Sequence, residues 1–408
     1  MRIGIAAVEV SGDRLGAELM RELKKSFPDA RFIGCGGERM LEQGLEMLCH
    51  LNRIEAIGIV EVLMRLIPLL RLRALVTREL IKRRVDLFIG VDGPDFNGHI
   101  ERRLTEAGIS CVHYVCPSIW AWRRGRAGYF SRVNRQILCL YPCEKQIIEN
   151  AGGVATYVGH PLADITPVSQ SHIRAQTALG LPGWIAGRKV IGILSGSRQS
   201  EIARLLPAFL ATARIMCEQQ PLALLVSAVN EQREALVSQL VEKHGKGLDV
   251  RVIPGEVQQL IASSHLVMVA SGTASLETLL VNRPMIVAYR VNWISYRLIR
   301  WLIKRSGQSQ CNLLTGEPIE QDAESLPLVS QPNLLGGGRL VPEFLQHQVQ
   351  PKAMAAACLQ LLGQDNTRLT ALFHHIHLEL RNNAASSAAK AIIPLLLEVT
   401  GQLAESHK

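Results

Sequence analysis

Aromatic residues and long apolar runs are both scarce in this sequence. Phe, Trp and Tyr make up 5% of the residues, and no tract of Lys and Arg alternates with them, which argues against a nucleic-acid-binding surface. No stretch reaches the roughly 18 consecutive apolar residues that a membrane-spanning helix requires. The chain opens with the strand-like segment RIGIAAV, without the charged start and cleavage site of an export signal. We therefore expect a cytoplasmic protein.

Several motifs of metal and cofactor binding are missing. The nine cysteines contain no CxxC pair, and Cys139 and Cys143 lack partners at zinc-site spacing, so we expect buried, reduced thiols and no metal site. The sequence has no GxGxxG dinucleotide fingerprint, no Walker A phosphate loop and no GxSxG nucleophile elbow. We expect no cofactor.

Size and charge indicate two globular domains and an anionic partner. A chain of 408 residues with 48% apolar and 20% charged residues is too long for one ordinary core. Its formal net charge of +9 suits nucleic acid, a phosphorylated small molecule or an acidic membrane surface. Because nucleic acid is disfavoured, the other two partners are preferred.

Short apolar runs alternate with helical patterns along most of the chain, which is typical of a parallel sheet with helices on both faces. The pattern pauses at residues 159–172 and then restarts, so we predict an α/β fold with successive domains at 1–165 and 166–365. Helices in 366–408 are expected to complete the first domain or to pack on a neighbouring subunit. The predicted strands are Ile3–Val8, Arg31–Cys35, Leu87–Val91, Cys111–Val115, Ile137–Leu140, Thr156–Val158, Lys189–Leu194, Leu222–Val226, Val250–Ile253, Leu266–Ala270 and Met285–Tyr289.

Acidic residues follow two strands of the first predicted domain, at the edge where parallel sheets bind ligands. Glu9 is expected as a carboxylate at a buried strand end, beside Ser11 and Asp13, which can cap the next helix. Asp92 and Asp95 bracket a Gly-Pro turn. Turn formation explains one of these two acids, whereas a proton acceptor with an orienting partner explains both. Which of them is the base stays open.

The most apolar stretch is IGIVEVLMRLIPLLRLRALV at residues 57–76, in which Pro68 is expected to separate two short helices. Two interpretations stay open: helices packed inside a domain, or a helix pair lying on a membrane with arginines near anionic headgroups. The segment HYVCPSIWAWRRGR either lines an acceptor pocket or packs its Trp residues in a core. The residues assigned to an acceptor and membrane patch are Ile59, Val62, Leu63, Leu66, Leu69, Leu70, Trp120 and Arg123.

Two loops of the second domain suit a phosphorylated nucleotide. Ser195–Ser197 offer backbone N–H groups after the first strand, and Arg198 adds a guanidinium, so the loop can hold a pyrophosphate; a plain helix start is the alternative. In ASGTASLE, Thr273 and Glu277 share one helix face. A carboxylate there can accept both hydroxyls of a ribose, although a Glu near a helix N-terminus is also favourable by itself. One nucleotide diphosphate explains both loops.

The motifs VEVSGD, GVDGPDFN, HYVCPSIWAWRRGR, VGHPLAD, GSRQSEI, SGTASLE, RPMIVAYR and QPNLLGGGRLVPEFLQ span nearly the whole chain. In this order they resemble the lipid-A-disaccharide synthase family. The resemblance implies two Rossmann-like domains of GT-B architecture with a helical C-terminal tail, the second domain holding a UDP-sugar. It also implies transfer of 2,3-diacylglucosamine from UDP to 2,3-diacylglucosamine 1-phosphate, with inversion, to give a β(1→6) disaccharide.

The resemblance carries roles to individual residues. Asp92, or failing that Asp95, matches the family's essential aspartate, Arg198 its arginine, Asn333 its asparagine, and Glu9 its acid after the first strand. We take these five as catalytic. The expected UDP contacts are Ser195, Gly196, Ser197, Arg198, Glu201, Ser271, Gly272, Thr273, Ala274, Ser275, Glu277 and Tyr289.

The resemblance also implies partners: the two lipid substrates, an anionic membrane at the inner face of the inner membrane, and a homodimer with exchanged C-terminal helices. Two departures are visible: the family usually reads GEASGD where Val8 and Val10 flank Glu9 here, and the segment between Ile303 and Asn333 is longer than usual. Another GT-B enzyme of UDP-sugars, an epimerase or a soluble-acceptor transferase, is the alternative and would not need the apolar patch. A nucleotide-sugar scaffold without chemistry would not need the acids.

Overall fold

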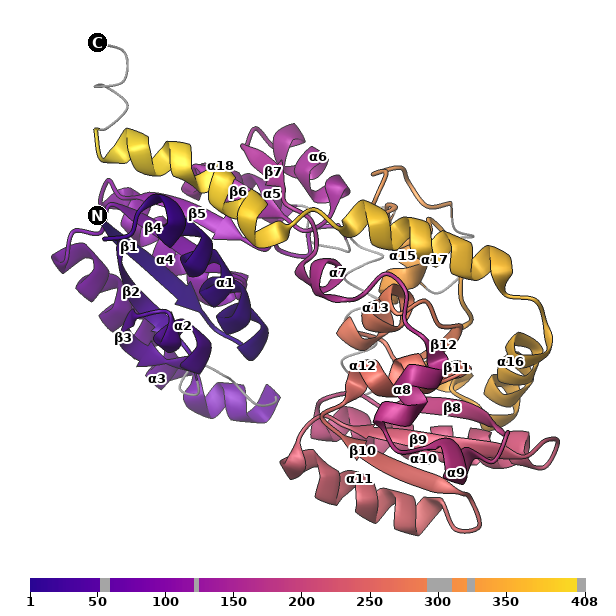
Figure 1. The fold of residues 1–408 in the computed structure, drawn as a ribbon. Coiled ribbons are helices and arrows are strands. Elements are labelled where there is room, and N and C mark those ends of the chain that lie inside the picture. Colours follow the sequence, from indigo (N-terminus) through magenta and orange to yellow (C-terminus); the bar gives the residue numbers. More distant parts are fainter. Residues whose placement is uncertain (52–58, 121–124, 292–309, 321–326, 402–408) are drawn as a thin grey trace. The chain divides into compact units, whose positions relative to one another are not determined.

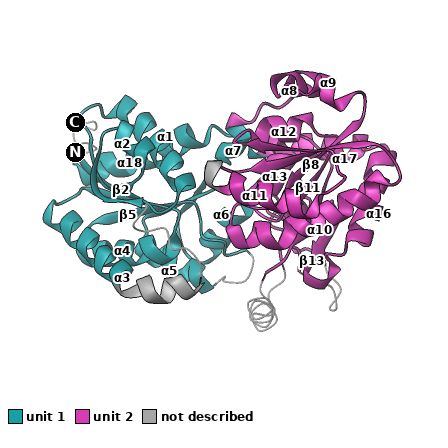
Figure 2. Ribbon diagram, turned by 90° about the horizontal axis from the view of Figure 1, so that it is seen from below, with its two compact units in different colours: residues 1–164, 380–408 teal, residues 165–379 magenta. Residues whose placement is uncertain are grey.

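The computed structural model describes residues 1–51, 59–120, 125–291, 310–320 and 327–401, with the side chains of 59–67 and 231–232 outside that description (Figure 1). The chain forms two compact units, Met1–Asp164 with Leu380–Lys408, and Ile165–Glu379 (Figure 2). Each unit is built on one parallel sheet. This is the two-domain α/β architecture that the alternating pattern predicts.

In the first unit seven parallel strands are ordered β3-β2-β1-β4-β5-β6-β7. Helices α1, α2 and α18 pack together on one side, and α3, α4 and α5 on the other (Figure 2), so the central strands are apolar on both faces. The strands are β1 (Arg2–Ala7), β2 (Arg31–Gly36), β3 (Leu45–His50), β4 (Leu87–Val91), β5 (Ser110–Tyr114), β6 (Gln136–Cys139) and β7 (Ala155–Tyr157). The helices are α1 (Val10–Ser26), α2 (Glu38–Glu42), α3 (Ile59–Lys82), α4 (Pro94–Glu106), α5 (Gly125–Val133), α6 (Pro142–Asn150), α7 (Pro161–Ile165) and α18 (Ala384–Val399).

In the second unit six parallel strands are ordered β10-β9-β8-β11-β12-β13. Apolar residues of α10 recur on one helix face, from Ile202 to Met216, and are buried against the sheet and α16. The strands are β8 (Lys189–Leu194), β9 (Leu222–Ala228), β10 (Val250–Pro254), β11 (Leu266–Ala270), β12 (Met285–Tyr289) and β13 (Glu343–Leu345). The helices are α8 (His172–Ala178), α9 (Pro182–Ile185), α10 (Gln199–Cys217), α11 (Glu231–His244), α12 (Val257–Ser263), α13 (Thr273–Leu280), α15 (Gln331–Leu335), η2 (Gln346–Gln348), α16 (Pro351–Gly363) and α17 (Thr367–Leu380).

All the predicted strands are confirmed almost residue for residue, but two edge strands were not predicted. Strand β3 mixes the exposed Glu46 with buried Leu45 and Cys49, and β13 has only three residues. Edge strands are covered on fewer sides than central ones, so their sequences carry a weaker apolar signal.

The last helix, α18, packs against α1 within the first unit of the same chain. Its buried face is formed by Ala384, Ala388, Ile392 and their neighbours, and Glu398 near its end accepts both 2.9 Å hydrogen bonds from Arg135. The chain returns to this unit at Leu380, and not already at residue 366 as expected, since α17 up to Glu379 belongs to the second unit.

The segment 159–164 fastens the start of α18. Asp164 accepts the N–H groups of Asn382, Asn383 and Ala384 at 3.1, 2.9 and 2.6 Å, and the His160 N–H donates to the Leu380 carbonyl at 2.8 Å. The Asp164 carboxylate therefore caps a helix that lies more than 200 residues later in the sequence.

We expect His160 to make stability fall at acid pH. Its ring is buried against Tyr141, and burial lowers the pKa of His160 from 6.5 to about 4. As the pH falls from 6.5 to 4, His160 binds a proton in the unfolded chain but stays neutral in the folded chain. The free energy of unfolding should therefore drop by about 1.4 kcal/mol per pH unit. His160→Asn, whose amide oxygen can still accept the Leu162 N–H, should remove this part of the slope.

The measurement is urea unfolding between pH 4.5 and 7.5, comparing each variant with the parent protein. His374→Asn, on the exposed side of α17, is the control and should keep the parent slope. Equal slopes for the parent protein and His160→Asn would show that His160 protonates freely in the folded state.

Candidate active site

The order of strands reverses once in each sheet, between β1 and β4 in the first unit and between β8 and β11 in the second. Parallel α/β sheets bind ligands beyond the carboxyl ends of strands at such a reversal. Glu9 and Asp92 follow β1 and β4, while Ser195–Arg198 and Ser271–Ser275 follow β8 and β11. These sequence-predicted residues thus lie at the carboxyl edge of the sheet in their own unit.

Asp92 occupies a tight turn directly after β4. Its φ is 54°, in the left-handed region that Asp tolerates and most residues avoid. The Asp92 Oδ1 accepts the Gly93 N–H at 2.7 Å, and the Asp92 N–H donates to the Tyr114 carbonyl at 2.8 Å. The wholly buried Asn97 donates to the carbonyls of Ala6 at 3.0 Å and of Asp92 at 2.7 Å. This amide therefore ties the turn to the end of β1.

Gly93 is required by both conformation and space. Its φ is 54°, and a Cβ at this position would lie 2.0 Å from Cγ2 of Val8. The Val8 that departs from the family's usual motif thus packs directly on the turn that carries Asp92. The close approach of these two loops makes any larger residue at position 93 incompatible with the observed turn.

Asp95 has surroundings different from those of Asp92. Its side chain is 79% exposed and forms an ion pair with Arg126. It sits in the first turn of α4, where a carboxylate also interacts favourably with the helix dipole. Of the two candidate bases, only Asp92 is held at the strand end by the turn itself, so the geometry favours Asp92.

The loop after β1 assigns different roles to its two acids. Glu9 is exposed and stands at the N-cap position of α1, not at a buried strand end as expected. Asp13 is buried and accepts the N–H groups of Gly37, Arg39 and Met40 at 2.6, 3.1 and 3.2 Å. Asp13 therefore caps α2, a helix distant in sequence, and Glu9 is the acid that faces solvent at this edge.

Strand β8 runs directly into the loop that carries Arg198. Gly196 has a φ of 109°, and a Cβ there would lie 2.6 Å from a carboxylate oxygen of Glu201. Glu201 accepts the N–H groups of Ser197 and Arg198 at 3.3 and 3.4 Å and the Arg198 Nη1 at 3.4 Å. Glu201 thus caps α10 and orients the guanidinium of Arg198, which is 78% exposed.

Two further side chains lie at this loop. Ser195 is buried, and its hydroxyl has no hydrogen-bond partner among the described residues. Burial and the Glu201 carboxylate raise the pKa of Tyr289, while Arg198 lowers it. Tyr289, the last residue of β12, therefore belongs to the same electrostatic neighbourhood as Arg198 and Glu201.

The loop after β11 starts α13 with an open glycine. Gly272 has a φ of 151°, which glycine readily adopts, and no atom lies within 4 Å of where its Cβ would be. Ser275 is buried and donates to the Gly272 carbonyl at 2.7 Å, and Ser271 donates to the Val329 carbonyl at 2.8 Å. Thr273 is exposed and Glu277 is half-buried one turn later, so both side chains lie at the start of this helix.

Asn333 does not reach the surface. It is wholly buried on α15, its amide nitrogen donates to the Val341 carbonyl at 3.1 Å and to Glu343 at 2.8 Å, and its oxygen accepts the Val341 N–H at 2.8 Å. In this structure Asn333 positions the loop 330–341 and does not offer a group to a ligand. A single sequence cannot distinguish these two roles of an asparagine.

The sequence matches the model of the lipid-A-disaccharide synthetase family over residues 3–323. It is 38% identical over 406 residues to the lipid-A-disaccharide synthase of Burkholderia lata, covering 98% of each chain. It is 39% identical over 395 residues to that of Pseudomonas putida, covering 97% of this chain and 98% of the relative. The chain belongs to this family. Like other lipid-A-disaccharide synthases it is a glycosyltransferase of lipid A biosynthesis.

Solved structures of low sequence identity share the GT-B fold of this lipid-A-disaccharide synthase family member. UDP-GlcNAc 2-epimerase from Neisseria meningitidis, bound to UDP-GlcNAc, has a TM-score of 0.56 at 11% identity, covering 98% of this chain and 100% of its own. MurG of Acinetobacter baumannii has a TM-score of 0.53 at 11% identity, covering 97% and 99%. These structural similarities show the fold, whereas the activity follows from the family match.

Only some residues of the predicted acceptor and membrane patch lie within the described part of the chain. Helix α3 continues through Pro68 instead of dividing there, since an interior proline removes one hydrogen bond without ending the helix. Leu69 is half-buried, Leu70 is 42% exposed and Trp120 is half-buried. No helix within the described residues is long and apolar enough to span a bilayer. The side chains of Ile59, Val62, Leu63, Leu66 and Arg123 lie outside the described residues.

All nine cysteines are free thiols. Cys116, Cys139 and Glu144 bring their ligand atoms within 4.8 Å of one another in the core of the first unit. Burial raises the pKa of the Cys116 thiol, which hydrogen-bonds Cys139, and Glu144 accepts the N–H groups of Leu140 and Tyr141 at 3.0 and 3.2 Å. Glu144 thus caps the start of α6 through these two hydrogen bonds.

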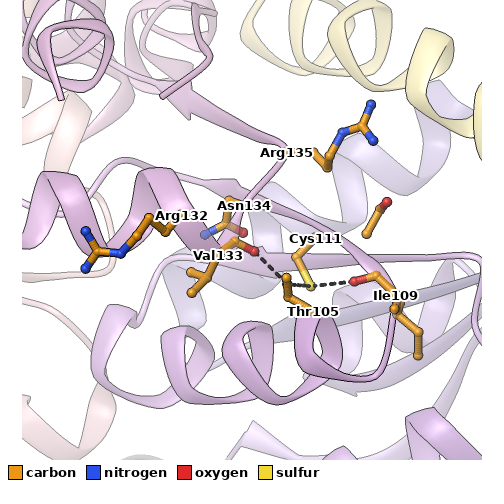
Figure 3. Close-up of a pocket in the computed structure, with 9 residues that line it drawn as sticks. Thr105, Ile109, Cys111, Arg132, Val133, Asn134 and Arg135 are labelled. Atoms are coloured by element: carbon orange, nitrogen blue, oxygen red, sulfur yellow. Dashed lines mark hydrogen bonds between the residues drawn. The ribbon is translucent and has the colours of Figure 1, made fainter. Parts of the chain in front are cut away.

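A pocket of about 200 Å³ lies elsewhere on the first unit (Figure 3). Its lining includes Thr105, Cys111, Arg132 and Arg135, with Thr105 donating to the Val133 carbonyl at 2.7 Å. These residues flank the starts of β5 and β6, the edge opposite to the predicted site. The pocket is therefore separate from the candidate active site.

Proposed function

We propose that the chain transfers 2,3-diacylglucosamine from UDP to the 6-hydroxyl of 2,3-diacylglucosamine 1-phosphate. The observation that supports this most is the pair of loops at the strand reversal of the second unit. One presents Arg198 and a Ser195 hydroxyl that has no hydrogen-bond partner among the described residues, and the other starts a helix at an open glycine with Glu277 one turn later. Together they suit the pyrophosphate and ribose of one nucleotide.

The proposed reaction is a single displacement. Asp92 takes the proton from the acceptor's 6-hydroxyl, the oxygen bonds to the anomeric carbon, and the bond from that carbon to the diphosphate breaks. UDP departs with its charge stabilised by Arg198 and the N–H groups at the start of α13, groups that are already oriented before the reaction. Attack opposite to the leaving group inverts the anomeric centre and gives a β linkage.

The test is to incubate the protein with both lipid substrates and to measure UDP and disaccharide over time. Equal amounts of the two products, and none without the acceptor, are expected. Proton NMR of the product should show the large anomeric coupling of a β linkage. Release of free sugar, an epimerised UDP-sugar, or transfer to a soluble acceptor at equal rate would contradict the proposed activity.

We further propose that α3 rests on an anionic membrane at the cytoplasmic face of the inner membrane. Leu70 and Leu75 are 42% and 43% exposed on this helix, beside the exposed Arg71 and Arg78. Replacing both leucines by Ser should lower co-sedimentation with phosphatidylglycerol vesicles severalfold, and replacing the exposed Leu372 on α17 should not. Equal binding of both variants would contradict this role of α3.

A homodimer with exchanged C-terminal helices remains a proposal as well. In the described chain α18 packs on α1 of its own unit, and an exchange would let the same surfaces meet between two copies. Light scattering that gives the mass of a single chain at all concentrations would contradict it.

A further inference from the structure

We propose that Glu343 is a positioning residue that holds the UDP-binding edge of the second unit in its working shape. This inference rests on the proposed function of that edge. Glu343 is the first residue of β13 and is half-buried. It lies within the motif QPNLLGGGRLVPEFLQ, but the sequence reasoning assigned it no role.

Four donors converge on the Glu343 carboxylate. Its Oε1 accepts the Val329 N–H at 2.8 Å. Its Oε2 accepts the Ser330 N–H at 3.3 Å, the Ser330 hydroxyl at 2.7 Å and the Asn333 amide at 2.8 Å. Ser330 and Asn333 are both wholly buried. A single carboxylate therefore fixes the approach to α15 and the side chain of Asn333.

The same network reaches the loop after β11. Val329 donates its N–H to Glu343, and its carbonyl accepts the Ser271 hydroxyl at 2.8 Å. Ser271 directly precedes Gly272, the N-cap residue of α13, and α13 packs against α15. A shift of Val329 is thus transmitted through one hydrogen bond to the loop that we expect to contact the diphosphate.

The carboxylate is specifically required because all four partners donate. Glutamine has the same shape but replaces one acceptor oxygen by an NH₂ group, which would face N–H or O–H donors. At least one buried donor would then lose its partner, and the loop would have to move to satisfy it. Asn333, expected from the family resemblance to be catalytic, acts in this scheme as the second member of the same support.

The experiment compares Glu343→Gln with Glu317→Gln, which alters an exposed glutamate in the same region. UDP affinity is measured by calorimetry, and kcat and KM are measured with both lipid substrates, at a temperature where circular dichroism shows each variant folded. Glu343→Gln should weaken UDP binding and raise the KM for the UDP-sugar by about tenfold to a hundredfold, as for a misplaced binding group. Its kcat should change less, and Glu317→Gln should behave as the parent protein.

Ser330→Ala provides a milder second variant, because it removes one donor and leaves the carboxylate in place. It should shift UDP affinity in the same direction by a smaller factor. In a double-mutant cycle, Glu343→Gln and Ser271→Ala should be non-additive, since both act through Val329.

The outcomes separate this inference from the proposed function. Parent protein that does not bind UDP would contradict the proposed function itself. Parent protein that binds UDP, together with folded Glu343→Gln that binds it equally well, would overturn the positioning role while leaving the function standing. Additive effects of Glu343→Gln and Ser271→Ala would show that the carboxylate does not act through the Ser271 loop.

Discussion

Replacing Asp92 by Asn is expected to lower kcat for disaccharide formation by about 10²–10⁴-fold, the loss that follows removal of a positioned proton acceptor. The fold should persist, because Asn also tolerates a left-handed backbone and its amide oxygen can still accept the Gly93 N–H that Asp92 accepts at 2.7 Å. An amide cannot take the proton of the acceptor hydroxyl at neutral pH. Initial rates of UDP release measure the effect, and UDP affinity should stay near the parent value.

The matched control is Asp95→Asn, which removes a carboxylate from the same turn. Asp95 is largely exposed and its ion pair with Arg126 is a surface contact, worth less than about 1 kcal/mol. Its turnover should therefore stay within a few-fold of the parent protein. Full turnover by Asp92→Asn combined with a large loss in Asp95→Asn would transfer the role of base to Asp95.

Replacing Arg198 by Ala should lower kcat by about 10²–10³-fold, comparable to the loss of one oriented donor at a developing negative charge. The guanidinium is largely exposed, yet Glu201 holds it at the start of α10, so little reorganisation is needed when UDP arrives. Arg198→Lys should recover only part of the rate, because an ammonium lacks the two-pronged contact of a guanidinium with phosphate. Steady-state kinetics and UDP calorimetry measure both effects.

Arg204→Ala is the control for Arg198, since Arg204 is an exposed arginine further along the same helix. It lowers the net charge by the same amount without touching the loop after β8. Equal losses in the two variants would mean that Arg198 acts only through long-range attraction of an anionic substrate, and not as a contact of the diphosphate.

Much of the scaffold could be read from the sequence because central parallel strands are buried on both faces. Runs such as Leu266–Ala270 are apolar throughout, and the helices between them have a clear period. The loops of the candidate site were also chosen from the sequence, because small and charged residues interrupt these runs just after the strands end. Strands β3 and β13, and the unbroken path of α3 through Pro68, depend on neighbours that local sequence does not reveal.

The roles of individual acids were harder to predict than their positions. Asp13, Asp164 and Glu343 each accept backbone N–H groups of a segment far away in sequence. Nothing near Asp13 in the chain distinguishes it from Glu9, which stays exposed. Likewise, the family resemblance predicts a catalytic role for Asn333, whereas the structure shows that its side-chain amide is hydrogen-bonded to Val341 and Glu343.

The Asp164 contact with the start of α18 has a consequence for synthesis of the protein. On the ribosome, residues 1–164 of the first unit emerge well before the helix that covers α1, because the whole second unit is translated in between. The second unit is contiguous in sequence and can fold before α18 has been made. A premature stop before residue 384 would therefore remove the helix that packs on α1 of the first unit. The second unit, residues 165–379, would still be complete.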